Sequence, residues 1–231
     1  MDTVTPGIAA AGSGPRALVI ACGAIAHELV ATLERAGLGN GAGGGPVRVE
    51  CLPADFHDTP EKIVPAVRAK LDAARESGLE PFVAYGDCGT GGRLDALLRE
   101  RGVERLPGAH CYAFFAGTER FDALAAEEPG TFWLTDWLAR NFERLVVRGL
   151  GIDRHPELAS VYFGNYARVV HLAQSPDEGG ETARDAEAAA RTLGLPLERV
   201  ATGLEPFAAS LLPALGARAI RVHAAPSHRP A

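Results

Sequence analysis

The chain has 231 residues, 47% of them hydrophobic and 23% charged, with a formal net charge of -6 at pH 7. This composition is typical of a globular protein and excludes a disordered or fibrous one. The negative charge and the lack of a basic run exclude a generic nucleic-acid binder, because that binding needs clustered Lys and Arg. Residues 1–16 do not resemble a signal peptide, and no apolar run reaches the roughly 20 residues of a membrane helix. We expect no nucleic-acid or membrane partner and a cytoplasmic location.

Three strand-loop-helix units are predicted in the first half of the chain. A short continuous apolar run at residues 17–22 indicates a strand buried on both faces, and residues 47–52 and 81–85 are two further strand candidates. Each is followed by a loop and then by apolar residues at helical spacing. Such repeated units predict an α/β fold, a parallel sheet of Rossmann-like βα units with right-handed crossovers. We expect residues 109–115 to add a fourth strand or extended segment.

The second half interrupts this alternation before returning to it. We expect a helical insertion at about residues 118–166, in which Trp133, Leu134, Trp137 and Leu138 form the apolar face of one helix. A strand at 168–173, a helix at 182–193 and weak strands near Val200 and at 219–222 follow. The prediction is a single α/β domain over residues 17–222, between disordered tails at 1–16 and 223–231.

The cysteines lie at related positions in this pattern. Cys22, Cys51 and Cys88 stand at or just beyond the ends of predicted strands, and Cys111 lies in the next segment. Ligands of open α/β sheets bind beyond the carboxyl ends of the strands, so the fold can gather these thiols. Three thiolates from separate loops can bind Zn(II) or a [4Fe-4S] cluster and leave one position open. Because the chain has no C-x-x-C pair, plain burial of free cysteines is the alternative.

The loop at residues 86–92 reads Gly-Asp-Cys-Gly-Thr-Gly-Gly. Its glycines allow the backbone to approach a ligand ahead of a helix N-terminus, which predicts a cofactor-binding role for Gly86, Gly89, Thr90 and Gly91. The loop matches neither the Walker A pattern nor the dinucleotide fingerprint. A tight turn without a ligand is the alternative.

Three further polar residues are candidates for the same site. Asp87, inside the glycine loop, and His57, after the second strand, are possible acid/base groups. His110 is a possible metal ligand or a contact behind one. Since neighbours in an extended segment point to opposite sides, we expect only one of His110 and Cys111 to face the site.

Several longer motifs point to a family. They are Cys22-Gly-Ala and the runs at residues 85–92, 110–117, 128–136 and 162–166. Together they resemble the signature stretches of the domain-of-unknown-function family 1638, over roughly residues 17–203. The resemblance implies a site at Cys22, Cys88 and Cys111, which lie inside these motifs, and not at Cys51. It also implies an association with corrinoid-dependent methyl-transfer systems, with a small-molecule substrate and a corrinoid protein or methyltransferase as partners.

Three functional hypotheses follow. The first is a metalloenzyme in which Cys22, Cys88 and Cys111 bind an iron-sulfur cluster or Zn, similar by analogy to the cluster sites of quinolinate synthase and diphthamide-synthesis enzymes. The second is a non-metal binding or accessory protein of a corrinoid system, although the chain lacks the Asp-x-His-x-x-Gly pattern of a corrinoid-binding domain. The third is a racemase-like enzyme in which Cys22 and Cys88 act as base and acid. Only the first requires Cys111.

Overall fold

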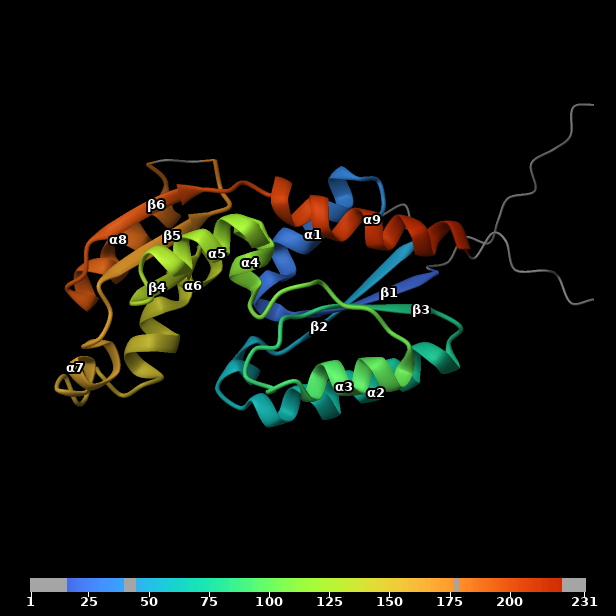
Figure 1. Cartoon of the computed structure of the whole chain (residues 1–231), viewed down its shortest axis with the longest axis horizontal. Helices are drawn as coiled ribbons and strands as arrows, with labels where there is room; N and C mark the ends of the chain where they lie inside the picture. The colour runs from blue at the N-terminus through green and yellow to red at the C-terminus, as the bar shows by residue number, and fades with distance from the viewer. Residues whose placement is uncertain (1–15, 40–44, 177–178, 222–231) are drawn as a thin grey trace, which may run out of the picture.

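The structure is a computed structural model that describes residues 16–39, 45–176 and 179–221. It contains two three-stranded parallel sheets, with strand orders β2-β1-β3 and β4-β5-β6. Figure 1 shows the two sheets in separate halves of the molecule. The predicted α/β class with parallel Rossmann-like units is therefore confirmed, but the strands form two sheets where one was expected. Apart from Arg16, the predicted tails lie outside the described residues.

The first sheet contains the three predicted βα units. Its strands are β1 (Ala17–Cys22), β2 (Val47–Leu52) and β3 (Glu80–Ala84), and the helices that follow them are α1 (Ala26–Arg35), α2 (Ile63–Glu76) and α3 (Arg93–Arg101). The central strand β1 is buried along its whole length, as its unbroken apolar sequence predicts. Helices α2 and α3 cover one face of this sheet, and α1 and α9 (Glu205–Arg221) cover the other (Figure 1).

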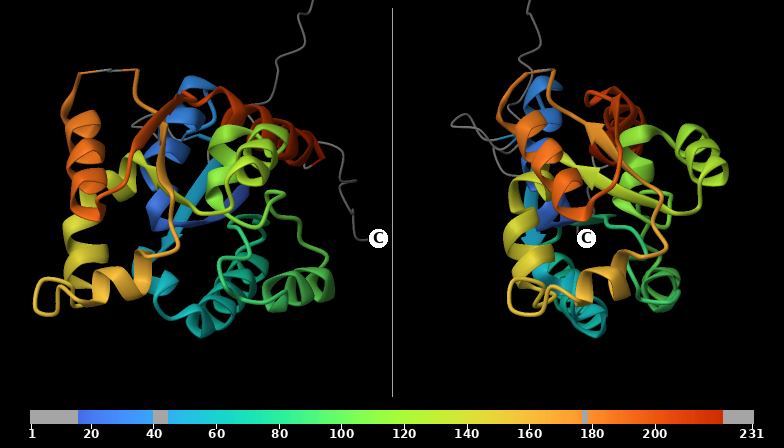
Figure 2. Two further views of the ribbon diagram at one scale, coloured as in Figure 1. Left: turned by 60° about the vertical axis from the view of Figure 1, so that its left-hand side comes forward. Right: turned by 90° about the vertical axis from the view of Figure 1, so that its left-hand side faces the viewer.

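The second sheet consists of β4 (Thr131–Thr135), β5 (Arg168–Ala173) and β6 (Leu197–Ala201). Figure 2 shows α8 (Glu181–Leu193) in orange beside α6 (Asp136–Phe142) in yellow. The green helices α4 (Cys111–Ala116) and α5 (Thr118–Glu127) lie across the sheet from them. The predicted strands at 168–173 and near Val200 and the predicted helix at 182–193 are confirmed.

Shorter helical turns lie in the connections. They are the 3-10 turns η1 (Gly23–Ile25), η2 (Ala54–His57) and η3 (Pro60–Lys62), the π-helical turn η4 (Glu143–Arg148), and the helix α7 (Leu158–Phe163). Two of them, η1 and η2, directly follow the carboxyl ends of β1 and β2. No helix among residues 16–39, 45–176 and 179–221 is long and apolar enough to span a membrane.

The prediction of an extended segment at residues 109–115 was wrong. His110 has an extended backbone, but the next six residues form α4. Gly108 and Gly117, both with positive φ, lie on either side of this helix. An apolar and aromatic run this short suits a strand or a helix, and here α4 buries Phe114 and Phe115 in the core.

The expected insertion at 118–166 is only partly helical, because β4 lies inside it and starts the second sheet. Trp133 and Leu134 belong to this strand and pack in different core clusters, as neighbours in a strand do. Trp137 and Leu138 belong to α6 instead. Thr135 separates strand from helix, since its hydroxyl accepts a hydrogen bond from the N–H of Leu138 over 3.2 Å.

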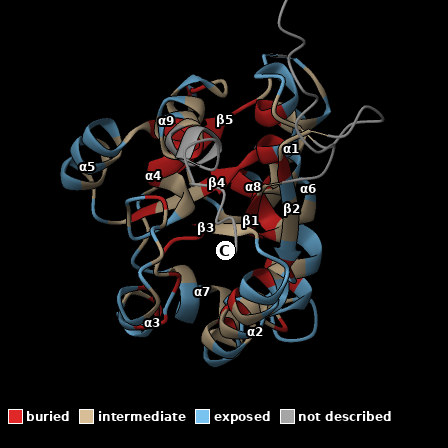
Figure 3. Ribbon diagram, turned by 90° about the vertical axis from the view of Figure 1, so that its right-hand side faces the viewer, coloured by how far each residue is buried: buried red, intermediate tan, exposed pale blue. Residues whose placement is uncertain are grey.

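The expected strand at residues 219–222 was also wrong, because residues 219–221 are the last turn of α9 and residue 222 lies outside the described residues. Phe207, Leu211 and Leu215 recur at helical spacing along α9, are fully buried, and pack with the first sheet. Figure 3 shows buried residues (red) on strands and inward helix faces. Helix α9 therefore returns from the second sheet and ties it to the first.

Candidate functional site

The three predicted cysteines lie around the carboxyl ends of β1 and β3. Cys22 is the last residue of β1, Cys88 lies four residues after β3, and Cys111 is the first residue of α4. The N–H of Ala24 donates a hydrogen bond to Cys22 Sγ over 3.3 Å, and His57 Nδ1 lies 4.0 Å from the same sulfur. The fold thus brings together thiols separated by up to 89 positions in the chain.

Tyr85 stands among these three thiols. It is fully buried, and no residue in the described part of the chain gives its hydroxyl a hydrogen bond of normal geometry. Burial raises its pKa, and the charges of Cys22, Cys88 and Cys111 raise it further. Its ring stacks on His57 with centroids 6.3 Å apart. The sequence places Tyr85 in a predicted strand and at the start of the motif at residues 85–92, but Tyr85 was not among the predicted site residues. Its place directly before the glycine loop was the available signal.

Cys88 has an unusual backbone that serves this arrangement. Its φ is 45°, in the left-handed region that favours glycine, and its N–H donates to Ala109 O over 3.2 Å. Burial raises the pKa of the Cys88 thiol, but hydrogen bonds from His110 and His57 outweigh it and lower the pKa to about 7. A substantial fraction of Cys88 is therefore converted to the thiolate near neutral pH.

His57, a predicted site residue, bridges two of the cysteines. Hydrogen bonds to Cys22 and Cys88 raise its pKa to about 11. Its Nδ1 lies 2.8 Å from Ala54 O within η2, so Nδ1–H donates to this carbonyl. This bond orients the imidazole ring, as a backbone carbonyl often does for metal-binding histidines.

Cys111 and His110 both act on Cys88, contrary to the expectation that only one would face the site. Burial and the charges of Cys88 and Cys22 raise the pKa of Cys111 well above its usual value. A hydrogen bond to Cys88 raises the pKa of His110. The backbone changes from extended to helical between these two residues, so the alternation of a strand does not apply. Cys51, by contrast, is exposed on the edge strand β2.

The thiols and imidazoles are close but are not arranged as finished metal ligands. Within residues 16–39, 45–176 and 179–221, no group of three His, Cys, Asp or Glu side chains has metal-binding geometry. The cluster does contain three sulfur donors and two imidazoles, which are ligands of zinc, and the thiols are also ligands of iron-sulfur clusters.

The side chain of Asp87 is engaged within its own loop. Its carboxylate accepts hydrogen bonds from the Thr90 hydroxyl at 2.5 Å, from Gly91 N–H at 3.0 Å and from Gly92 N–H at 2.9 Å. The bond from Thr90 is the main cause of its lowered pKa. Asp87, Thr90 and Gly91, three of the predicted site residues, are therefore hydrogen-bonded to one another within the loop. These bonds hold the turn that carries Cys88.

Gly86 and Gly89 also have reasons to be glycine within the protein. A Cβ on Gly86 would lie 2.8 Å from Ala109 O, because the glycine loop passes directly against the segment that leads to Cys111. Gly89 has a φ of 81°, and a Cβ there would lie 3.1 Å from Pro60. The glycines therefore allow close contact between the Cys88 loop and its neighbours.

A second buried polar cluster, which sequence reasoning missed, lies at the end of β4. Asp136 Oδ1 accepts a hydrogen bond from His171 Nε2 at 2.8 Å, and Oδ2 accepts from Ser175 N–H at 2.7 Å. The N–H of Asp136 donates to Gln174 Oε1 at 2.9 Å. A carboxylate directly after a buried strand was the available signal. This cluster links β4, β5 and the start of α6.

Comparison with family models gives one informative match. The model described as a protein of unknown function (DUF1638) matches residues 51–211. The match contains Cys88 and Cys111 but starts after Cys22, so the resemblance seen from residue 17 extends further toward the N-terminus than the match does. Neither the curated proteins nor the solved structures gave a significant match. The chain therefore belongs to the DUF1638 family.

Proposed function

We propose that Cys22, Cys88 and Cys111 hold an iron-sulfur cluster or a zinc ion, and that the protein is a metal-dependent enzyme. The observation that carries this proposal is the placement of three thiols from three separate segments around the buried hydroxyl of Tyr85. Structural burial alone requires no such convergence, because a free cysteine packs equally well anywhere in a core.

The residues present fit such a centre by their chemistry. Thiolates are the preferred ligands of iron-sulfur clusters and good ligands of zinc, and the lowered pKa of Cys88 favours the thiolate. A cysteine side chain has one rotatable bond before its sulfur, so each thiol changes direction through a single rotamer change. When bound, the metal would supply a Lewis acid or an open coordination position. His57 and His110 would hold protons beside the thiolates.

The cellular role is proposed from the family resemblance. We assign the enzyme to one-carbon or methyl metabolism in the cytoplasm, with a small-molecule substrate and a corrinoid protein or methyltransferase as partner. A reducing compartment is consistent with four free cysteines.

The test is metal analysis of protein purified without oxygen, together with its absorbance spectrum. Bound iron with a broad visible band indicates a cluster, and bound zinc without colour indicates a zinc site. Cys22→Ser, Cys88→Ser and Cys111→Ser should each lose most of the metal, whereas the control Cys51→Ser should keep it. Metal-free wild-type protein with freely titrating Cys22, Cys88 and Cys111 would overturn the proposal.

A second candidate function is favoured by the hydrogen bonds of His57 to both Cys22 and Cys88. Two thiols that share one imidazole can act as base and acid on opposite sides of a substrate carbon, as in a cofactor-free racemase. This candidate requires Cys22 and Cys88 but not Cys111. Deuterium incorporation from heavy water into a substrate by metal-free Cys111→Ser protein would support it over the metal centre.

A further inference from the structure

A cavity of about 250 Å³ lies between the two sheets, beside the cysteine cluster. Its wall includes Ala24 and Ala54, which follow β1 and β2, and Thr135, the last residue of β4. The carboxyl ends of strands from both sheets therefore border the same space. This is the position where open parallel sheets bind their ligands.

One side of the cavity is formed by α6 and the π-helical turn η4. Trp137 and Leu138 contribute from α6, and Leu145 and Val146 contribute from η4. Isolated π-helical turns are rare and frequently occur at functional sites, because they displace side chains that a regular helix would place elsewhere. The presence of η4 in the wall is therefore a second reason, independent of the cysteines, to infer that this cavity binds a ligand.

The opposite side connects the cavity to the proposed metal centre. Cys111 and His57 both line it. His57 also contacts Cys22, and both His57 and Cys111 interact with Cys88. A molecule in the cavity therefore has apolar side chains at one end and the cysteine cluster at the other.

The charge of the wall restricts what can bind. The lining, as far as the structure describes it, includes no Lys or Arg, and its charged groups are the Asp58 carboxylate and the His57 imidazolium. The positive charge of His57 is already engaged by its hydrogen bonds to Cys22 and Cys88. Phosphate and carboxylate groups are recognised mainly by Arg and Lys, which are missing from this wall. Burying an unpaired charge of either sign against Trp137 and Leu138 costs several kcal/mol, so an uncharged molecule is favoured.

The size of the cavity limits the ligand further. An apolar protein cavity of about 150 Å³ accepts benzene. A space of about 250 Å³ therefore accommodates a six-membered ring with a few additional atoms and is too small to enclose a nucleotide or a corrinoid.

We infer that this cavity is the substrate pocket of the cysteine centre, and that it selects a compact, uncharged, mainly apolar organic molecule. Its apolar group packs on Trp137, Leu138 and Val146, and its polar end meets Cys111 and His57. The assignment to a substrate rests on the proposed function, while the selection by size and charge rests on the cavity alone.

Three probes of one shape test the inference: cyclohexanol, cyclohexanecarboxylate and the cyclohexylammonium ion. Trp137 reports occupancy, because the chain has two tryptophans and Trp133→Phe leaves only the one in the cavity wall. In this variant cyclohexanol should shift the Trp137 emission to shorter wavelength and bind about tenfold or more tightly than either ion. Equal binding of all three probes, or no binding of cyclohexanol by folded protein, would overturn the inference.

A matched pair of substitutions locates the bound probe. Leu150 and Leu195 are both partly buried against the same core cluster, but only Leu150 lines the cavity. In the Trp133→Phe background, Leu150→Phe should weaken cyclohexanol binding about tenfold, whereas Leu195→Phe should leave it unchanged. Equal effects of the two substitutions contradict the assignment.

Metal content, measured separately, distinguishes this inference from the proposed function. Selective cyclohexanol binding by protein that purifies without metal supports the cavity's selection and removes the metal centre. Metal-loaded protein that fails to bind cyclohexanol retains the metal centre and overturns the pocket. Protection of the Cys111 thiol from alkylation by bound cyclohexanol, in metal-free protein, supports the contact between pocket and cluster.

Discussion

The Nε2 of His171 lies 2.8 Å from Oδ1 of Asp136, and both side chains are only 2% exposed. Asp136 also accepts hydrogen bonds from the backbone and hydroxyl of Ser175. Strand β5 and the start of α6 are therefore joined through one carboxylate. Because charged groups this deep require partners, the cluster holds the second sheet in register with the helix that lines the cavity.

Asp136→Asn should destabilise the protein by about 2 to 4 kcal/mol at pH 7, because it breaks a buried charge-assisted network. Burial raises the pKa of Asp136, but its bonds to His171 and Ser175 outweigh this, so the pKa is lowered in the folded protein. The stabilisation is then present above the pKa of the unfolded chain and is lost as pH falls through the lower folded-state pKa. Urea unfolding from pH 7 to pH 3 should show wild type and variant converging. The exposed Asp122→Asn is the control.

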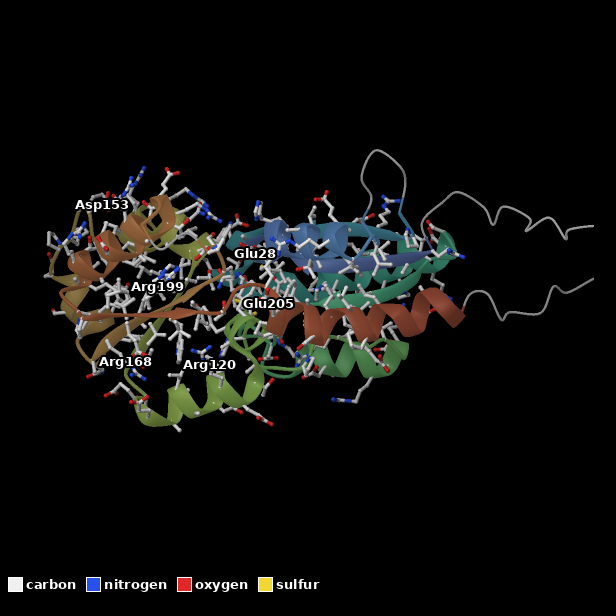
Figure 4. The ribbon with its side chains drawn as sticks, turned by 90° about the horizontal axis from the view of Figure 1, so that it is seen from above. Glu28, Arg120, Asp153, Arg168, Arg199 and Glu205 are labelled. Atoms are coloured by element: carbon white, nitrogen blue, oxygen red, sulfur yellow. The ribbon has the colours of Figure 1, made fainter. Side chains whose placement is uncertain are left out.

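Glu28→Gln should stabilise the protein at pH 7, which is the opposite of the effect of Asp136→Asn. Figure 4 shows Glu28 where α1 meets the second half of the molecule. Its side chain is 5% exposed, and Arg140 Nη2 lies 3.9 Å from its Oε1. Burial raises the pKa of Glu28 in the folded protein. The protonated side chain therefore stabilises the fold, fully below the pKa of the unfolded chain. This stabilisation is lost as the pH rises through the folded-state pKa.

The Gln variant should therefore gain on the order of 1 kcal/mol at pH 7 and nothing near pH 4, measured by urea unfolding. Glu34→Gln, at an exposed position of the same helix, should change stability at neither pH. A loss of stability on Glu28→Gln at pH 7 would show that the Arg140 contact outweighs the cost of burial.

At position 88, glycine should be more stable than alanine. Both Cys88→Gly and Cys88→Ala remove the thiol, but only alanine retains a Cβ at a φ of 45°. The glycine variant should be more stable by about 1 kcal/mol in thermal unfolding of metal-free protein. At Ala74, inside α2, glycine should cost about 1 kcal/mol relative to alanine, the usual order in a helix. If the alanine variant is the more stable one at position 88 as well, the backbone of Cys88 is not strained.

Gly86→Ala should weaken the cysteine site although it removes no donor. The new Cβ would lie 2.8 Å from Ala109 O and would push the loop of Cys88 away from the segment that leads to Cys111. We expect a loss of about 1 to 3 kcal/mol in unfolding free energy and reduced metal content in protein purified without oxygen. Gly179→Ala, where a Cβ meets no atom within 4 Å, should leave both unchanged.

The sequence alone determined the βα units of the first half, because buried strands such as Ala17–Cys22 need an unbroken apolar run and amphipathic helices need apolar residues at fixed spacing. It also placed Cys22, Cys51 and Cys88 at related positions, since carboxyl ends of parallel strands share an edge. The family resemblance implied Cys111 in place of Cys51. It could not show that β4 interrupts the expected insertion, because an apolar run containing Trp133 and Leu134 suits a helix or a strand equally well.

Only the tertiary structure decided what surrounds those cysteines. The stacking of His57 on Tyr85, the hydrogen bond from Cys88 N–H to Ala109 O and the approach of Ala109 to Gly86 all join segments that are distant in the chain. The return of α9 to the first sheet and the cavity between the sheets depend on how whole layers pack. Local patterns in a sequence report which face of an element is buried, whereas packing between layers decides what it is buried against.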